Sequence, residues 1–218
     1  MPHDLHRSFH LCLLCSFVAI AFGCAGRESE MKLTARPTAD LFFPLDEFYS
    51  AEGRSLPKID QIDGASMPQP YRQLLVHQGD MTPTLEKFHG SRISLKLFDK
   101  RLGADGWLSR RVALLLDKTG APVEFGAIRI NLNLFSIEAQ QHILEGKRPL
   151  GTILNEDGIK HSSRPVAFLR VQSDDLINQT LSLTKSQTLY GRRNVLYNER
   201  NEPLAEVVEI LPPTESRR

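Results

Sequence analysis

Cysteine is almost missing from this chain. Its three cysteines, Cys12, Cys15 and Cys24, all lie within the first 24 of 218 residues. The remaining sequence therefore offers no disulfide framework, no cysteine metal site and no cysteine nucleophile. This absence does not argue against export, because a chain of this length buries enough apolar surface to fold without disulfides.

An excess of charge of one sign is missing as well. The 27 Lys and Arg residues nearly balance the 26 Asp and Glu residues, for a formal net charge of +1. Nucleic-acid-binding proteins usually show a basic excess, so we expect no nucleic-acid partner. The histidines lack metal-site spacing, and neither a glycine-rich phosphate loop nor a serine-hydrolase elbow occurs. We therefore expect no metal and no cofactor. We also expect a monomer.

The longest apolar run lies near the N-terminus, over residues 9–22, after a weakly basic start. It is too short and wrongly flanked for a transmembrane helix. Small residues before Cys24 are typical of bacterial lipoprotein signal peptides, in which the cysteine is lipidated after cleavage. We expect a lipoprotein-type signal peptide over residues 1–23 and an exported protein, anchored in the cell envelope through a lipid on Cys24. An ordinary secretion signal or an uncleaved anchor is the alternative.

The remainder has the length of one domain. We expect a tether and N-terminal segment over residues 24–50, in which the apolar cluster at 41–49 docks on the core or begins a short helix. The domain itself is expected over residues 51–212. It starts with a loop rich in Gly, Pro, Ser and Asp at 52–70. A disordered tail is expected over residues 213–218.

Hydrophobic periodicity predicts both helices and strands in this domain. Helices are expected at 70–77, at 82–88 with Asp80 as its cap, and at 137–144. Strands are expected at 93–98, 110–116, 123–132, 164–172, 188–198 and 204–211. Short connections favour antiparallel pairing, and strands do not alternate regularly with helices. The sequence therefore predicts an α+β fold with a single antiparallel β-sheet and helices packed on one side.

Four stretches carry a resemblance to a known family, and they occur in the same order along the chain. They are Gly79-Asp-Met-Thr82, Arg110-Arg111 with the strand that follows, Leu144-Glu-Gly-Lys-Arg-Pro-Leu-Gly151, and Tyr190-Gly-Arg-Arg193 with the closing strand. Residues 78–212 resemble the chorismate lyases, which split chorismate into 4-hydroxybenzoate and pyruvate. The same fold is shared by a ligand-sensing domain of some bacterial transcription regulators.

The resemblance implies an enclosed, apolar pocket. Met81 takes the place of a methionine that lines the product pocket. Leu150 takes the place of a leucine whose backbone contacts the ligand. The alternatives are a plain core methionine and an ordinary helix-to-loop transition with a glycine cap.

The family's carboxylate-binding arginine falls on Arg110 or Arg111. A planar guanidinium can hold a carboxylate through two parallel hydrogen bonds. Adjacent strand residues point to opposite faces, so only one of the two enters the pocket. We favour Arg111 as the catalytic clamp because Ala113 and Leu115 share its face, and keep Arg110 as a substrate-binding candidate. Solvated charges at the strand end are the alternative for both.

The closing strand of the family carries a glutamate shortly before a Leu-Pro pair. Counting back from Pro212 without a gap ends on Val208, so placing Glu209 there requires a shift of one residue, which a β-bulge could supply. We predict Glu209 as the catalytic acid–base group and Glu206 as a second, substrate-binding candidate. The arginines of Tyr190-Gly-Arg-Arg193 are expected to be structural or sheet-surface charges.

These residues suit the elimination of pyruvate from chorismate, which needs a dry pocket, a cationic clamp and one acid–base group. Burial raises the pKa of a glutamate and lets it exchange protons near neutral pH. Chorismate is a cytosolic metabolite, however, and export would separate it from the enzyme. A non-catalytic envelope lipoprotein that binds a small aromatic or carboxylate ligand is therefore the second hypothesis. A structural lipoprotein with a vestigial pocket is the third.

Overall fold

The computed structural model describes residues 38–214. The expected signal peptide over residues 1–23, the lipidation site at Cys24 and the tether up to residue 37 lie outside the described residues, as do residues 215–218 of the tail. Within residues 38–214, no helix is both long enough and apolar enough to cross a membrane.

The domain is built on a single antiparallel sheet, as the sequence predicted. Within the described residues, seven strands pair in the order β1-β5-β6-β7-β4-β3-β2. The sequence neighbours β2 and β3, β3 and β4, and β6 and β7 are joined by short connections, which is why they pair as hairpins. The strands are β1 (Ile59–Ile62), β2 (Ile93–Leu102), β3 (Trp107–Leu116), β4 (Pro122–Asn131), β5 (His161–Gln172), β6 (Thr188–Asn198) and β7 (Pro203–Leu211).

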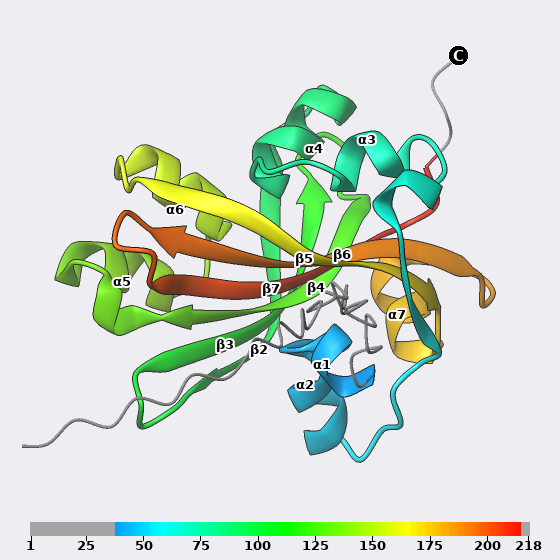
Figure 1. The fold of residues 1–218 in the computed structure, drawn as a ribbon, viewed down its shortest axis with the longest axis horizontal. Coiled ribbons are helices and arrows are strands. Elements are labelled where there is room, and N and C mark those ends of the chain that lie inside the picture. The colour runs from blue at the N-terminus through cyan, green and yellow to red at the C-terminus, as the bar shows by residue number, and fades with distance from the viewer. Residues whose placement is uncertain (1–37, 215–218) are drawn as a thin grey trace, which may run out of the picture. The chain divides into compact units, whose positions relative to one another are not determined.

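Four helices pack on one side of this sheet (Figure 1). Their apolar residues recur at helical spacing and face the strands. Ser136 starts α5 by accepting a hydrogen bond from the Ala139 backbone N–H, and Gly146 ends it in the left-handed conformation, at a φ of 67°. The four helices are α3 (Tyr71–Leu75), α4 (Met81–His89), α5 (Ile137–Glu145) and α6 (Leu150–Glu156).

The opposite face of the sheet carries three further short helices, α1 (Thr38–Phe42), α2 (Leu45–Ala51) and α7 (Asp175–Leu181) (Figure 1). Phe42 and Phe48 are fully buried there, in the same cluster as Phe125 of β4. The apolar cluster at 41–49 was expected to dock on the core or to begin a short helix, and it does both. The apolar cluster at 41–49 belongs to the core, and the folded domain starts before residue 51.

Strand β1 lies inside the stretch that was expected to be loop. Ile59 and Ile62 flank two polar residues, and the strand pairs with β5 from Ile59 opposite Val171 to Ile62 opposite Phe168. Four residues are too short a run for a periodic signal, and the strand forms because β5 offers it an edge.

The central strands approach one another very closely at two glycines. A Cβ atom on Gly126 of β4 would overlap the Val208 carbonyl of β7, and one on Gly191 of β6 would overlap the Glu209 carbonyl. Only glycine permits this approach, so β7 is held tightly between its two neighbours.

If α1 is part of the core, Phe42→Ala will lower the free energy of unfolding by about 3–5 kcal/mol, because it leaves a cavity in the cluster. Urea denaturation of the folded domain measures this change. Ile137→Ala is the control, since Ile137 is 76% exposed and its truncation should cost no more than about 0.5 kcal/mol. Equal effects of the two substitutions would contradict the placement of α1.

Candidate ligand-binding site

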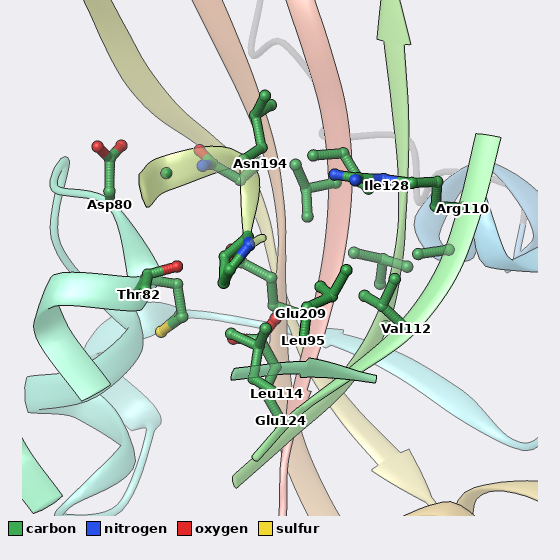
Figure 2. Close-up of a pocket in the computed structure, with 18 of the residues that line it drawn as sticks. Asp80, Thr82, Leu95, Arg110, Val112, Leu114, Glu124, Ile128, Asn194 and Glu209 are labelled. Carbon is green, nitrogen blue, oxygen red and sulfur yellow. The ribbon is translucent and has the colours of Figure 1, made fainter. Parts of the chain in front are cut away.

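A cavity of about 70 Å³ lies between the sheet and helices α4 and α6 (Figure 2). Because a buried water needs about 10–15 Å³ by this measure, the space suits a small ligand. Its walls are largely apolar, as in most small-molecule sites. The apolar side chains are Met81, Leu95, Val112, Leu114, Ile128, Leu150, Leu196 and Val207.

The structure brings four of the six predicted ligand-site residues to this cavity. Met81 at the start of α4, Arg110 of β3, Leu150 at the start of α6 and Glu209 of β7 all line it. Residues distant in sequence therefore meet at one site, in the combination that the resemblance implied. Their roles in binding or catalysis stay predictions.

Arg110 is the cation of this cavity. Its side chain is almost fully buried, at 1% exposure. One Nη donates to the Ile143 carbonyl at 3.4 Å, whereas Nε has no partner and no carboxylate pairs with the side chain among the described residues. Burial lowers the pKa of Arg110 to about 10, which still leaves it protonated at neutral pH. A buried charge without a counter-ion is costly, and an anionic ligand would offset that cost.

Arg111, which the sequence analysis favoured for the pocket, points away from it. Its Nη2 lies 2.8 Å from Oε1 of Glu52 on the opposite face of the sheet, and its guanidinium lies 5.9 Å from the ring centre of Phe48. The choice rested on the apolar neighbour Ala113 on the same face. Because helices cover both faces, apolar neighbours do not tell the two faces apart, and Arg110 lines the cavity instead.

Glu209 lies in the cavity wall and is held by an arginine. Arg192 of β6 is fully buried and donates from Nε to Glu209 Oε2 at 2.5 Å. The remaining nitrogens of Arg192 donate to the carbonyls of Leu75, His77 and Gly79 at 3.1 to 3.3 Å. Arg192 thus ties the segment before α4 to the sheet and balances the charge of Glu209.

Glu206 lies on the face of β7 opposite the cavity, where Arg193 donates to it at 3.2 Å. Burial raises its pKa, although Arg193 opposes the shift. The pairing of β7 with β4 is continuous from Ala205 to Ile210. Glu209 therefore reaches the cavity through ordinary strand alternation, and no bulge lies between Glu209 and Leu211; the irregularity of β7 is at its start, between Pro203 and Ala205.

Glu124 is a cavity residue that the sequence analysis missed. It lies on β4, is 5% exposed, and its Oε2 has no hydrogen-bond partner among the described residues. Burial raises its pKa well above the usual range and Glu209 raises it further, whereas Arg192 lowers it. Burial and Glu209 thus both disfavour the ionised form of Glu124. The sequence could have indicated this residue, because Glu124 is the only carboxylate in the apolar run over residues 122–128.

Asp80, also in the cavity wall, does not cap α4 as expected. Its side chain makes no capping hydrogen bond. Both of its carboxylate oxygens instead lie within 3.0 Å of Nε2 of His161, at the start of β5. This hydrogen bond raises the pKa of His161, partly opposed by burial.

Comparison with known proteins gives structural neighbours only. No family model matches the chain, and no curated protein matches its sequence. The effector domain of PhnF from Mycobacterium smegmatis is 13% identical, over 61% of this chain and 88% of that chain, with a TM-score of 0.47. A structure of PhnF from the same organism is 10% identical, over 77% of this chain and 92% of that chain, with a TM-score of 0.48.

A transcriptional regulator of the GntR family from Enterococcus faecalis V583 is 15% identical, over 57% of this chain and 99% of that chain, with a TM-score of 0.41. The Enterococcus faecalis protein is named as a transcriptional regulator and the Mycobacterium smegmatis domain as an effector domain. The likenesses are too distant to argue function, which depends on the geometry of the cavity.

Replacing Arg192 by Met leaves Glu209 buried without its counter-ion, so the free energy of unfolding should fall by about 3–5 kcal/mol. The double variant Arg192→Met/Glu209→Met should lose less than the two single losses combined, because both charges are then gone. Urea denaturation measures all three variants. Arg170→Met is the control, since its ion pair with Asp60 is exposed and should be worth at most about 1 kcal/mol.

The Asp80–His161 pair should make stability depend on pH. The folded protein raises the pKa of His161, so this stabilisation is full below the ordinary histidine pKa of about 6.5 and is lost as the pH rises through the folded-state value. The difference in Tm between the wild type and His161→Gln should therefore be larger near pH 5.5 than near pH 8.5. A difference that stays constant with pH would contradict the pairing.

Proposed function

We propose that residues 38–214 form a binding domain for a small organic anion, with a carboxylate as the group that Arg110 holds. The observation that carries this proposal is the buried guanidinium of Arg110, which lines the cavity and has no carboxylate partner among the described residues. Arginine presents a planar set of donors that matches a carboxylate, so the ligand would supply both the missing charge and the missing acceptor.

The rest of the cavity supports the same ligand class. Apolar side chains from Val112, Leu114 and Leu150 line the space. In such surroundings an ion pair with Arg110 is stronger than it would be in solvent. A compact ligand with an apolar body and one anionic end fits this arrangement best.

A second candidate function is elimination of pyruvate from chorismate. Glu209 faces the same cavity as Arg110, and Glu124 adds a second carboxyl group whose pKa burial raises. A carboxylate held beside a protonated acid could move a proton during such a reaction. Binding ranks first because Glu209 is already engaged by Arg192.

Anchoring in the cell envelope through Cys24 is also a proposal, supported by the apolar run and the small residues before this cysteine. Growth of cells that express the full chain with an alkyne-bearing fatty acid would test it. Label that appears on the wild type and is lost in Cys24→Ser would support the proposal. Equal labelling of both would contradict it.

Replacement of Arg110 by Met should abolish carboxylate binding while raising the Tm of the ligand-free protein, because an uncompensated buried charge gives way to an apolar side chain. Isothermal titration with benzoate measures binding, and a loss of more than about tenfold is expected. Arg111→Met is the matched control, since Arg111 adjoins Arg110 and lies on the other face. Equal losses in both variants would contradict the proposed clamp.

If the domain is a lyase, the purified protein will convert chorismate to 4-hydroxybenzoate faster than the uncatalysed reaction, as followed by chromatography. Glu209→Gln should then reduce the rate, by about a hundredfold for a lost acid–base group. Glu206→Gln should leave the rate unchanged because Glu206 lies on the other face. If the protein binds benzoate but does not convert chorismate, the lyase function is contradicted and only the binding function remains.

A further inference from the structure

The cavity has two polar ends. Arg110 lies opposite Ile128 in the pairing of β3 with β4, and Leu114 lies opposite Glu124. Arg110 and Glu124 are therefore separated by four residues along the strand pair, or about 13 Å at 3.3 Å per residue. Figure 2 shows Glu124 and Glu209 near each other and apart from Arg110.

The end that holds Glu124 contains more carboxyl groups than cations. Glu124 of β4 and Glu209 of β7 both line the cavity, and Arg192 of β6 pairs with Glu209 alone. Glu124 is 5% exposed, and its Oε2 has no hydrogen-bond partner among the described residues. The other charged groups of the cavity wall are Arg110, at the far end, and Asp80, which is engaged by His161.

A buried carboxyl group without a partner is costly in either protonation state. A cation placed beside it would remove that cost, and would leave the two carboxylates facing two cations, Arg192 and the ligand. Helices α4 and α6, which cover this part of the cavity, contribute Met81, Thr82 and Leu150 to its wall and no positive charge. Among the described residues, the cation that acts on Glu124 is therefore Arg192, which is already paired with Glu209.

We propose that Glu124 binds a cationic amine, so that the ligand is a short zwitterion with its carboxylate on Arg110 and its ammonium group on Glu124. This inference rests on the proposed anion-binding function and adds the chemistry of the ligand's second end. The apolar side chains of Val112, Leu114 and Ile128 lie between the two ends and would contact the ligand's uncharged middle. Binding of the ammonium group ionises Glu124, and its proton leaves to the solvent.

Three benzoates of nearly equal shape test the inference. They are 4-(aminomethyl)benzoate, 4-(hydroxymethyl)benzoate and 4-ethylbenzoate, which end in an ammonium group, a neutral hydrogen-bonding group and an apolar group. Isothermal titration of the wild type should give a Kd for the aminomethyl compound about tenfold or more below those of the other two, as for a charged hydrogen bond. Hexanoate and 6-aminohexanoate provide a flexible pair with the same contrast.

The variants assign the effect to one residue. Glu124→Gln should remove the preference for the ammonium group while keeping the binding of 4-ethylbenzoate. Glu206→Gln is the control, because Glu206 lies on the opposite face of the sheet and should change neither value. Titration of the wild type in buffers of different ionisation enthalpy gives a readout that does not depend on any variant. A proton should be released with the aminomethyl compound and not with the hydroxymethyl compound.

The failures of the two proposals can be told apart. If the ethyl and hydroxymethyl compounds bind in an Arg110-dependent way and the aminomethyl compound binds no better, the anion site stands and the zwitterion inference is overturned. Tighter binding of the hydroxymethyl compound would show that Glu124 acts as a neutral hydrogen-bond donor. If none of the compounds binds the wild type, the proposed function fails and the inference fails with it.

Discussion

The ion pair between Arg192 and Glu209 is the interaction on which the site depends. It joins the last hairpin to the segment before α4 through the carbonyls of residues 75, 77 and 79. It thereby holds the segment that leads into α4, whose Met81 lines the cavity. It also consumes the charge of one arginine and one glutamate, so the remaining buried charges of the cavity, Arg110 and Glu124, are the groups that a ligand can satisfy. Arg192 and Glu209 therefore stabilise the fold, whereas Arg110 and Glu124 are the groups proposed to bind the ligand.

A sheet covered on both faces explains how the chain keeps these roles separate. Alternation sends Arg110 to the cavity and Arg111 to the α2 side, and sends Glu209 to the cavity and Glu206 to Arg193. On the α2 side each arginine has a carboxylate partner, Glu52 for Arg111 and Glu206 for Arg193, although Nε of both arginines lacks a hydrogen bond. On the cavity side Arg110 has no carboxylate partner among the described residues, and this difference is the basis of the proposed binding function.

Much of the architecture could be predicted from local patterns. The hairpins, α4 and α5 have clear periodicity and turn or capping residues, and Met81, Leu150 and Glu209 were found through motifs of the family resemblance. The face of β3 could not be chosen, because it depends on which helices cover each side. For the same reason the start of the domain was placed at residue 51, after the helices at residues 38–51, since their burial depends on contacts with strands such as β4, more than 70 residues away.

Two further errors arose where a side chain has a long-range alternative to its local role. Asp80 has the position of a helix cap, but His161, 81 residues later, binds its carboxylate. Glu124 was overlooked although a lone acid in an apolar strand is unusual. The periodicity of the strand predicts neither that such an acid is buried nor that it lacks a partner. Both facts follow from the three-dimensional structure of the cavity.

The absence of a side chain at Gly126 limits how this site could change during evolution. Its backbone forms part of the cavity floor, and the neighbouring Val208 carbonyl leaves no room for even a methyl group. At this position the cavity is bounded by the main chain, and a side chain on residue 126 cannot be added to make the cavity shallower. New ligand preferences would have to arise at the walls, at positions such as Leu95, Val112 and Val207, where one apolar side chain can replace another without disturbing the sheet.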